Sequence, residues 1–449
     1  MKHLHPLWWL IIPVLLSACF HDSSDAASGN TIKLGVVTAR FGNPISLPGQ
    51  AATLAMEEIN AAGGINGTPI ELIIKDSACS STITPGEVAS LAASDAIVAL
   101  VGPSCSSVGT VLIQDVLPVY NLPAVAITTT SPTLTSLDED DLYYRLRLSD
   151  QVQTVSLLNE LIADGVTRLG IIHRGGNDSF NIALAEGLAA QFSALDNKQT
   201  VVVVDYPEAA LVEFSSEVDE LFDAGTIDGI AIFGFATDSA NVASSIATEL
   251  TERAINLSDI LGVYTNNLTR LDESLQISSA LALLNGSKSV SSDALSNATA
   301  PNYAPWLTDF LQAFPGSEGQ PEAYDAVYLI SLAMLQGQVD GTNTVAQIRS
   351  TIKTNLRGVS GTNAAVDAVT INPGDFATAA STITAGGTVN YNGASGIIDF
   401  DEFGDVNYGD LSVIEASIVA DKLEFNCLHL VRVFTQDNAI ATEQNVCEP

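Results

Sequence analysis

The chain has 449 residues, and its 17 Lys and Arg against 52 Asp and Glu give a formal net charge of −35. Because 47% of the residues are apolar and only 15% are charged, the composition excludes a disordered acidic tail and indicates globular domains, roughly two or three at this length. The surplus of acid argues against nucleic acid or an anionic lipid surface as a partner, because both would be repelled.

The first residues are typical of an exported protein. An apolar run over 4–16 is too short to cross a bilayer comfortably and has the length of a signal-peptide core. The run ends in the letters LSAC at 16–19, which resemble a bacterial lipobox, so we expect residues 1–18 to be cleaved and Cys19 to carry a lipid. An ordinary secretory signal followed by a chance cysteine is the alternative. Residues 19–30 are rich in Ser, Asp, Ala and Gly and are expected to form a flexible tether.

The expected location is therefore the periplasm or the cell exterior, where the protein is held to a bacterial membrane only through its lipid. Four cysteines follow the lipobox, at spacings that lack the CxxC pattern of zinc or thioredoxin-like sites: Cys79, Cys105, Cys427 and Cys447. In an oxidising compartment four cysteines predict two disulfides. Proximity in sequence favours Cys79–Cys105 and Cys427–Cys447, although three connectivities are possible.

From residue 31 onward, short β-branched runs alternate with amphipathic helical patterns. In a first unit, strands are expected at 32–37, 70–75, 97–101 and 124–128, with helices at 48–62, after Pro85 and from Ser106. In a second unit, strands are expected at 169–173, 201–204, 229–233 and 260–263, with helices near 150–164, 180–194, 214–224 and 239–253. Such alternation with short loops predicts parallel sheets covered on both faces, so the expected fold class is α/β with two doubly wound lobes.

Six short blocks of sequence then follow one another in an order known from a protein family. They are EEINAAGGING at 57–67, VGPSCSS at 101–107, TSPTLT at 130–135, AEGL at 185–188, AYDAV at 323–327 and GASGIIDFDEFGD at 393–405. Together they resemble the periplasmic Leu/Ile/Val-binding proteins, which are type I solute-binding proteins. The resemblance implies two Rossmann-like lobes on a three-strand hinge that close on a small solute for an ABC importer. It also implies a disulfide in the first lobe at the positions of Cys79 and Cys105.

The resemblance sets the expected domain boundaries. Lobe 1 should comprise 31–147 with 278–358, lobe 2 should comprise 148–277 with 391–449, and the hinge should lie near 147, 277 and 358. Residues 359–390 have no clear counterpart and are expected to form an insertion on the lobe surface. The tail that contains the last two cysteines is expected to extend the second lobe.

The candidate ligand residues of the first lobe stand where strands end. In open α/β sheets ligands bind beyond the carboxyl ends of strands, where helix N-termini present free N–H groups. Ser106 opens a helix after strand 97–101, and Thr128 and Thr130 occupy the same junction one strand later. The resemblance implies that these three residues contact the α-carboxylate and α-ammonium of an amino acid. A plain helix N-cap and a loop with self-satisfied hydroxyls are the alternatives.

The second lobe matches the family less closely. Phe180 stands where the family has a ligand-packing Tyr, with a core residue as the alternative. The resemblance also implies an acidic anchor for the ammonium group after strand 260–263, but no carboxylate stands there, and Tyr264 is taken as the ligand-facing residue. Burying an ammonium without a counter-charge is costly. Either another acid such as Asp178 or Asp238 supplies the charge, or the ligand has no ammonium. Elsewhere, Arg40 is expected either to meet an acidic ligand or to be a solvated surface residue.

Other chemistry finds little support in the sequence. His173 and His429 are the only histidines of the expected folded part, and no G-x-S-x-G, H-E-x-x-H or Walker motif occurs. The sequence therefore predicts no enzyme, metal or cofactor. The predicted function is that of a monomeric, lipid-anchored substrate-binding protein that captures a small carboxylate-bearing solute, foremost an amino acid, for an ABC permease. A ligand-sensing or regulatory lipoprotein of the same fold, not coupled to transport, is the alternative.

Overall fold

The computed structural model describes residues 31–39, 47–138, 140–207, 213–266, 278–291, 300–436, 439–445 and 447. The signal segment, Cys19, the tether and Arg40 lie outside these residues, and what the sequence predicts for them stays a prediction. Among the described helices, none combines the length and the apolar composition that a membrane span requires.

The first lobe is built on a sheet of five parallel strands in the order β2-β1-β3-β4-β5. The strands are β1 (Ile32–Thr38), β2 (Ile70–Asp76), β3 (Ala99–Val101), β4 (Ala124–Ala126) and β5 (Tyr143–Arg145). Alternate residues of a strand point to opposite faces, and in β1 Leu34 and Val36 enter one apolar core while Val37 enters another. Both faces of the sheet are therefore covered.

Helices supply these covers. They are α1 (Leu47–Ala61), α2 (Thr84–Ala93), α3 (Ser106–Asp115), α4 (Leu117–Tyr120), the 3-10 turn η1 (Pro132–Ser136), α11 (Tyr303–Ala313), α12 (Glu322–Gln336), α13 (Val345–Asn355) and α14 (Phe376–Thr384). The helix predicted over 48–62 is α1, and its expected apolar face is buried through Ala51, Leu54, Ala55 and Ile59.

The second lobe is built on a sheet of eight strands in the order β16-β15-β14-β10-β9-β8-β6-β7. Its parallel part comprises β6 (Arg168–Arg174), β7 (Gln199–Tyr206), β8 (Gly229–Phe233), β9 (Gly262–Thr265) and β10 (Lys288–Ser291). Its antiparallel part comprises β14 (Tyr408–Val419), β15 (Lys422–Gln436) and β16 (Ala439–Asn445). The helices are α5 (Asp150–Ala163), α6 (Ser179–Ser193), α7 (Ser215–Asp223), α8 (Ala236–Glu252), the 3-10 turn η2 (Leu257–Asp259) and α9 (Ser278–Leu284).

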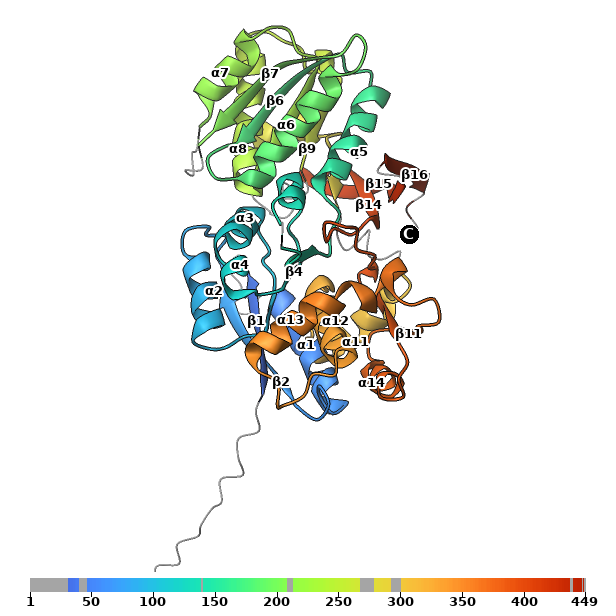
Figure 1. Cartoon of the computed structure of the whole chain (residues 1–449). Helices are drawn as coiled ribbons and strands as arrows, with labels where there is room; N and C mark the ends of the chain where they lie inside the picture. The colour runs from blue at the N-terminus through green and yellow to red at the C-terminus, as the bar shows by residue number, and fades with distance from the viewer. Residues whose placement is uncertain are drawn as a thin grey trace, which may run out of the picture.

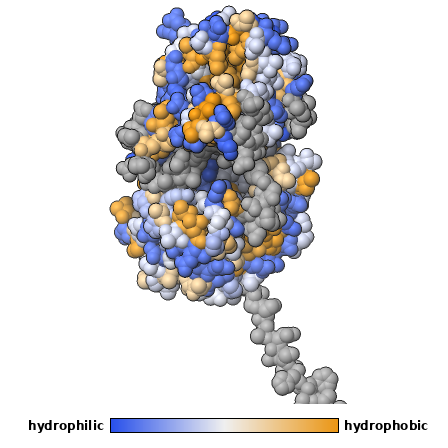
Figure 2. All heavy atoms as spheres, turned by 180° about the vertical axis from the view of Figure 1, so that it is seen from behind, coloured by the Kyte–Doolittle hydropathy of each residue, from blue (hydrophilic) through white to orange (hydrophobic). Residues whose placement is uncertain are grey.

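The two lobes stand one above the other, and the predicted fold class is confirmed (Figure 1). Seen from behind, polar and apolar side chains are interspersed over both lobes (Figure 2).

The strand pairings differ from the expected lobe boundaries. β10 pairs with β9 and with β14, so residues 278–291, expected in lobe 1, lie with the second sheet. The chain then returns to the first lobe for 300–406, where the orange helices of Figure 1 lie beside the blue ones. The crossings between lobes accordingly lie near 147, between 291 and 300, and near 406, and not near 277 and 358.

The segment expected to be an insertion on the surface is part of the first-lobe core. It contains β11 (Val369–Ile371), α14 and the start of β12 (Val389–Gly393), which with β13 (Gly396–Ile397) form a small sheet. Ile371, Phe376 and Val389 are fully buried against the same core as α1 and α12. Residues 359–390 are therefore part of the packed first lobe, and the prediction of an insertion on its surface is wrong.

Both predicted cysteine pairings are present as disulfides. Cys79 is bonded to Cys105 in the first lobe, and Cys427 of β15 is bonded to Cys447. β15 pairs with β14 and β16 pairs with β15, so the tail extends the second sheet, as the sequence predicts.

A buried ion pair joins the first crossing segment to the third. Arg145 is fully buried at the end of β5, and its Nε donates to Asp405 Oδ1 at 2.5 Å while its Nη2 pairs with the other carboxylate oxygen. The same guanidinium donates to Ser131 O at 2.8 Å and to Thr135 Oγ1 at 2.7 Å. Because a guanidinium offers five donors in a fixed plane, this one side chain fixes both crossings and the loop after β4.

Candidate ligand-binding site

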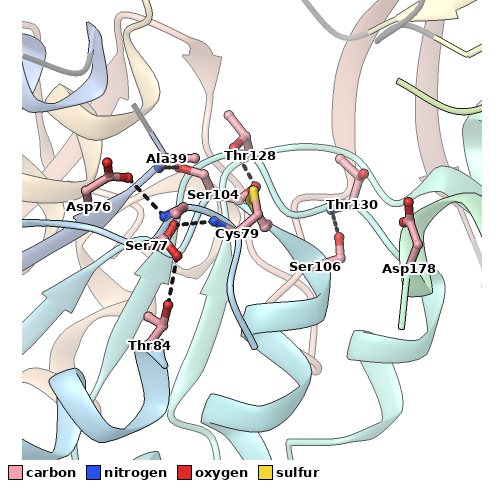
Figure 3. The surroundings of a disulfide bond; sticks show 12 residues. Ala39, Asp76, Ser77, Cys79, Thr84, Ser104, Ser106, Thr128, Thr130 and Asp178 are labelled. Atoms are coloured by element: carbon pink, nitrogen blue, oxygen red, sulfur yellow. Dashed lines mark hydrogen bonds between the residues drawn. A yellow bond between two sulfur atoms is a disulfide. The ribbon is translucent and has the colours of Figure 1, made fainter. Parts of the chain in front are cut away.

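The carboxyl ends of β3 and β4 lead into two loops that meet where α3 begins (Figure 3). Ser106 is nearly buried, and its Oγ accepts hydrogen bonds from the backbone N–H groups of Thr130 and Ser131, both at 3.3 Å. Thr128 Oγ1 donates to the carbonyl of Ser104 at 2.8 Å. The structure therefore brings Ser106, Thr128 and Thr130 together at one edge of the sheet.

Ser106 is not the N-cap of α3, because Cys105 holds that position. Since its Oγ already accepts two hydrogen bonds, its one O–H remains a donor, for which the described residues provide no acceptor. The first N–H groups of a helix also have no partner within the helix. The edge therefore presents O–H and N–H donors together, which is the arrangement that holds a carboxylate.

A disulfide and a glycine fix the path of the chain between β3 and α3. The Cys79–Cys105 disulfide attaches the residue before α3 to the loop after β2 (Figure 3). Gly102 has φ +109°, and a Cβ there would lie 2.2 Å from the carbonyl oxygen of Val37. Only glycine fits this close approach, so the chain can turn out of β3 directly into α3.

The second lobe meets this edge through the start of α6. Ser131 Oγ donates to the carbonyl of Ser179 at 3.1 Å, which links the loop after β4 to the first residue of α6. Phe180, the next residue, is half-buried and packs against the apolar core. Asp178 caps the helix by accepting from Asn181 N at 3.2 Å, and Figure 3 shows it beside Thr130.

Arg174 at the end of β6 gathers two acids on this side of the second lobe. It pairs with Asp178 at 3.3 Å and with Asp238 in the first turn of α8 at 3.5 Å, and its guanidinium lies 4.7 Å from the ring centre of Phe235. Burial raises the pKa of Asp238, which the charge of Arg174 opposes. Both acids that the sequence offered as ammonium anchors are thus engaged with one arginine.

Tyr264 does not face the ligand edge, so the prediction that it contacts the ligand is wrong. Its side chain is fully buried, and its hydroxyl donates to Asp164 at 2.7 Å, at the carboxyl end of α5. A Cβ on Gly262 would lie 2.3 Å from that hydroxyl, so the ring extends back over the start of β9, away from the strand's carboxyl end. Asn266, which follows the strand, donates to Asn181 at 2.6 Å instead.

One acid at this junction is absent from the sequence-based candidates. Asp150 is the first residue of α5, its side chain is buried, and its N–H donates to the carbonyl of Thr130 at 2.7 Å. Burial raises the pKa of Asp150 to about 7, against a hydrogen bond from the Thr130 hydroxyl and the charge of Arg145. An acid in the first helical turn after a crossing could have signalled it, but such acids also occur at ordinary helix starts.

No group of three or more His, Cys, Asp or Glu side chains suited to a metal ion occurs in the part of the chain that the structure describes.

A family model described as periplasmic binding protein matches residues 31–401. The chain belongs to the periplasmic binding protein family. The resemblance drawn from the six sequence blocks is thereby confirmed, and the family is one of solute-binding proteins, not enzymes.

Relatives of this periplasmic binding protein span most of its length. The chemotactic signal transduction system substrate-binding protein BasB of Halobacterium salinarum is 24% identical over 375 residues, which cover 79% of this chain and 81% of that protein. The leucine binding protein LivK of Thermotoga maritima superimposes with a TM-score of 0.63 at 16% identity, covering 88% of this chain and 98% of the other. A solute binding protein of an ABC transporter from Rhodopseudomonas palustris, in complex with p-hydroxybenzoic acid, superimposes with a TM-score of 0.64 at 14% identity, covering 93% and 98%.

Proposed function

We propose that this periplasmic binding protein captures a small carboxylate-bearing solute, foremost an amino acid, between its lobes and delivers it to an ABC permease. The observation that carries the proposal is the donor-rich edge at the start of α3, where the Ser106 O–H stands beside the first N–H groups of the helix. Phe180 supplies an apolar surface on the opposite lobe. The two surfaces would bind the solute non-covalently, the first lobe through hydrogen bonds and the second through apolar contact.

The proposal includes the location and the assembly state. The lipobox at 16–19 supports attachment through Cys19 to a membrane outside the cytoplasm, and the protein acts as a monomer. The two disulfides support an oxidising compartment.

Ligand-dependent melting of residues 20–449 tests the proposal. The panel holds apolar and polar L-amino acids, their deaminated counterparts, and aromatic acids such as p-hydroxybenzoate. A true ligand at 100 times its Kd should stabilise the fold by about 2.7 kcal/mol and raise the melting temperature visibly. Ser106→Ala removes the O–H donor and should weaken binding by roughly tenfold.

Ser350→Ala, on the exposed side of α13, is the matched control and should bind as the unchanged protein does. If no carboxylate of the panel raises the melting temperature, the proposal is wrong.

A second candidate function is ligand sensing without transport. The name of the Halobacterium salinarum relative, which is aligned over 79% of this chain, places that protein in a chemotactic signalling system. Uptake of the labelled ligand by cells that lack the gene separates the two functions. Loss of uptake supports transport, whereas intact uptake with a lost response to the ligand supports sensing.

A further inference from the structure

A cavity of about 120 Å³ opens in the first lobe, among α1, α11, α12 and the loop after β11. These helices lie beside one another in Figure 1. α1 and α12 belong to the core on one face of the first-lobe sheet, whereas α3 belongs to the core on the other face. The cavity is therefore separate from the donor-rich edge at Ser106. It has room for several water molecules, and hence for a guanidinium or a short alkylammonium group.

Two carboxylates line this cavity, and the described residues provide no cation for either. Glu58 of α1 is half-buried and Asp309 of α11 is exposed, and neither forms an ion pair within the described part of the chain. Burial raises the pKa of Glu58, against hydrogen bonds from two tyrosines, and the charge of Asp309 raises it further. Two acids that repel each other in this way are stabilised by a cation that both can reach.

Two phenols hold Glu58 at the wall of the cavity. Tyr328 donates to Glu58 Oε2 at 2.8 Å, and Tyr324 donates to the same oxygen. Both hydroxyls accept in turn from Gly374 N, at 3.0 Å for Tyr328 and 2.9 Å for Tyr324. Because these donors carry no charge, they orient the carboxylate without neutralising it.

The other walls are largely apolar, with one unmatched donor. Pro305, Trp306, Tyr324 and Pro373 all line the cavity. Trp306 is 2% exposed, and its Nε1 donates to no acceptor among the described residues. A buried donor without a partner is rare in native proteins and points to a water or a ligand in the adjoining cavity. Aromatic and proline walls suit the carbon atoms of an organic cation better than the hydration shell of a metal ion.

We propose that this cavity binds a small organic cation through its ammonium or guanidinium group. The N–H donors of the cation bind Glu58 and Asp309, and its carbon atoms pack against Trp306 and Tyr324. A neutral molecule of the same shape leaves the two acids unmatched, and a tetraalkylammonium ion has no N–H group to donate. The inference goes beyond the proposed function, because the site requires no solute at Ser106.

Tryptophan fluorescence reports on this cavity alone. Residues 20–449 contain Trp306 as their single tryptophan, since Trp8 and Trp9 precede Cys19. The probes are n-butylammonium, 1,4-diaminobutane and guanidinium, each titrated as the chloride at constant ionic strength. At least one should change the emission of Trp306 saturably. It should bind at least about tenfold more tightly than n-butanol, which has no charge, and tetramethylammonium, which has no N–H group.

Glu58→Gln should weaken binding of the cation by roughly tenfold, because it removes the charged acceptor and keeps an oxygen for the two phenols. Glu57→Gln is the matched control. It removes the same charge one residue earlier in α1, at an exposed position that does not line the cavity, and should leave the affinity unchanged. If Glu58→Gln does not fold, Asp309→Asn, at an exposed position, replaces it and should weaken binding by roughly threefold.

Calorimetric titration of the same probes shows whether a silent fluorescence signal hides binding. Equal affinity for n-butylammonium and n-butanol, or an affinity that survives Glu58→Gln, overturns cation recognition. A response to calcium chloride but to none of the organic cations makes this a metal site and also overturns it. Binding of Nα-acetyl-lysine amide without binding of any free cation assigns the cavity to a side chain of another protein. If no probe changes the emission or produces heat, the proposal is wrong, whatever the carboxylates do in the melting experiment.

Discussion

Asp150 links the chemistry of a single side chain to the stability of the whole fold. Its pKa is raised from 3.8 to about 7 by burial, so between these two pH values the folded protein holds a proton there that the unfolded chain has lost. A raised pKa of an acid stabilises the fold below the unfolded value of 3.8, and this stabilisation disappears as the pH rises through about 7.

Asp150→Asn should therefore be more stabilising at pH 8 than at pH 4.5 in the absence of ligand. The amide carries no charge at either pH, so the substitution removes the cost of a buried carboxylate only where that carboxylate is ionised. The gain at pH 8 should be on the order of 4 kcal/mol at most. Urea unfolding of both proteins at the two pH values measures it. A free-energy difference that does not change with pH would show that Asp150 titrates alike in both states.

The position of Tyr264 shows how far residue-level prediction from the sequence could go. Ser106, Thr128 and Thr130 come together as expected, because each follows a strand whose end was predicted to within two residues. The strand expected at 260–263 is β9, over Gly262–Thr265, so Tyr264 lies inside it and not after it. Since side chains alternate along a strand, such a shift decides whether a residue faces a core or a loop.

At the scale of elements, the segment over 359–390 shows what composition conceals. Its Thr, Ala, Gly and Asn residues give no strong period, yet five apolar positions in it are fully buried: Val359, Ile371, Phe376, Ala379 and Val389. Nothing local indicates this, because the partners lie in α1 and α12, remote in sequence. The short strand β10 was missed for the same reason: its four residues, KSVS, acquire their place only through β9 and β14.

Phe376→Ala should destabilise the protein by about 3–5 kcal/mol, because it empties a filled site in the core under α14. Val366→Ala, in the same segment but fully exposed, is the control and should change stability by less than about 0.5 kcal/mol. Thermal and urea unfolding monitor both variants. Equal, small effects would mean that the segment lies on the surface, as composition alone suggests.

At the scale of the whole molecule, net charge opposes compactness. A charge of −35 on a folded body repels itself, and bringing two acidic lobes together adds to that repulsion. The fold class, the alternation of elements and the family could be predicted from the sequence, since each rests on local pattern or on blocks in fixed order. The positions at which the chain passes between the lobes could not be predicted, because strand pairing between residues remote in sequence has no local sequence pattern.

Added salt should therefore raise the melting temperature. Between about 0.01 and 0.5 M NaCl the screening length falls from roughly 30 Å to below 8 Å, which weakens repulsion between surface carboxylates. Melting followed by circular dichroism over this range provides the measurement, with an uncharged osmolyte of equal osmolality as the control. A melting temperature that falls with salt would mean that attractive surface pairs outweigh the repulsion.

The direction of β1 would decide which lobe lies nearer the membrane if Cys19 carries a lipid. Its carboxyl end faces the ligand edge, so its amino end lies on the far side of the first lobe (Figure 1). The twelve residues from 19 to 30 could span at most about 40 Å even if fully extended, which limits the distance between a lipid on Cys19 and the first lobe. The first lobe would then be the half attached to the membrane, and the second lobe would lie farther out. The ligand edge between them would face away from the lipid, toward the solvent.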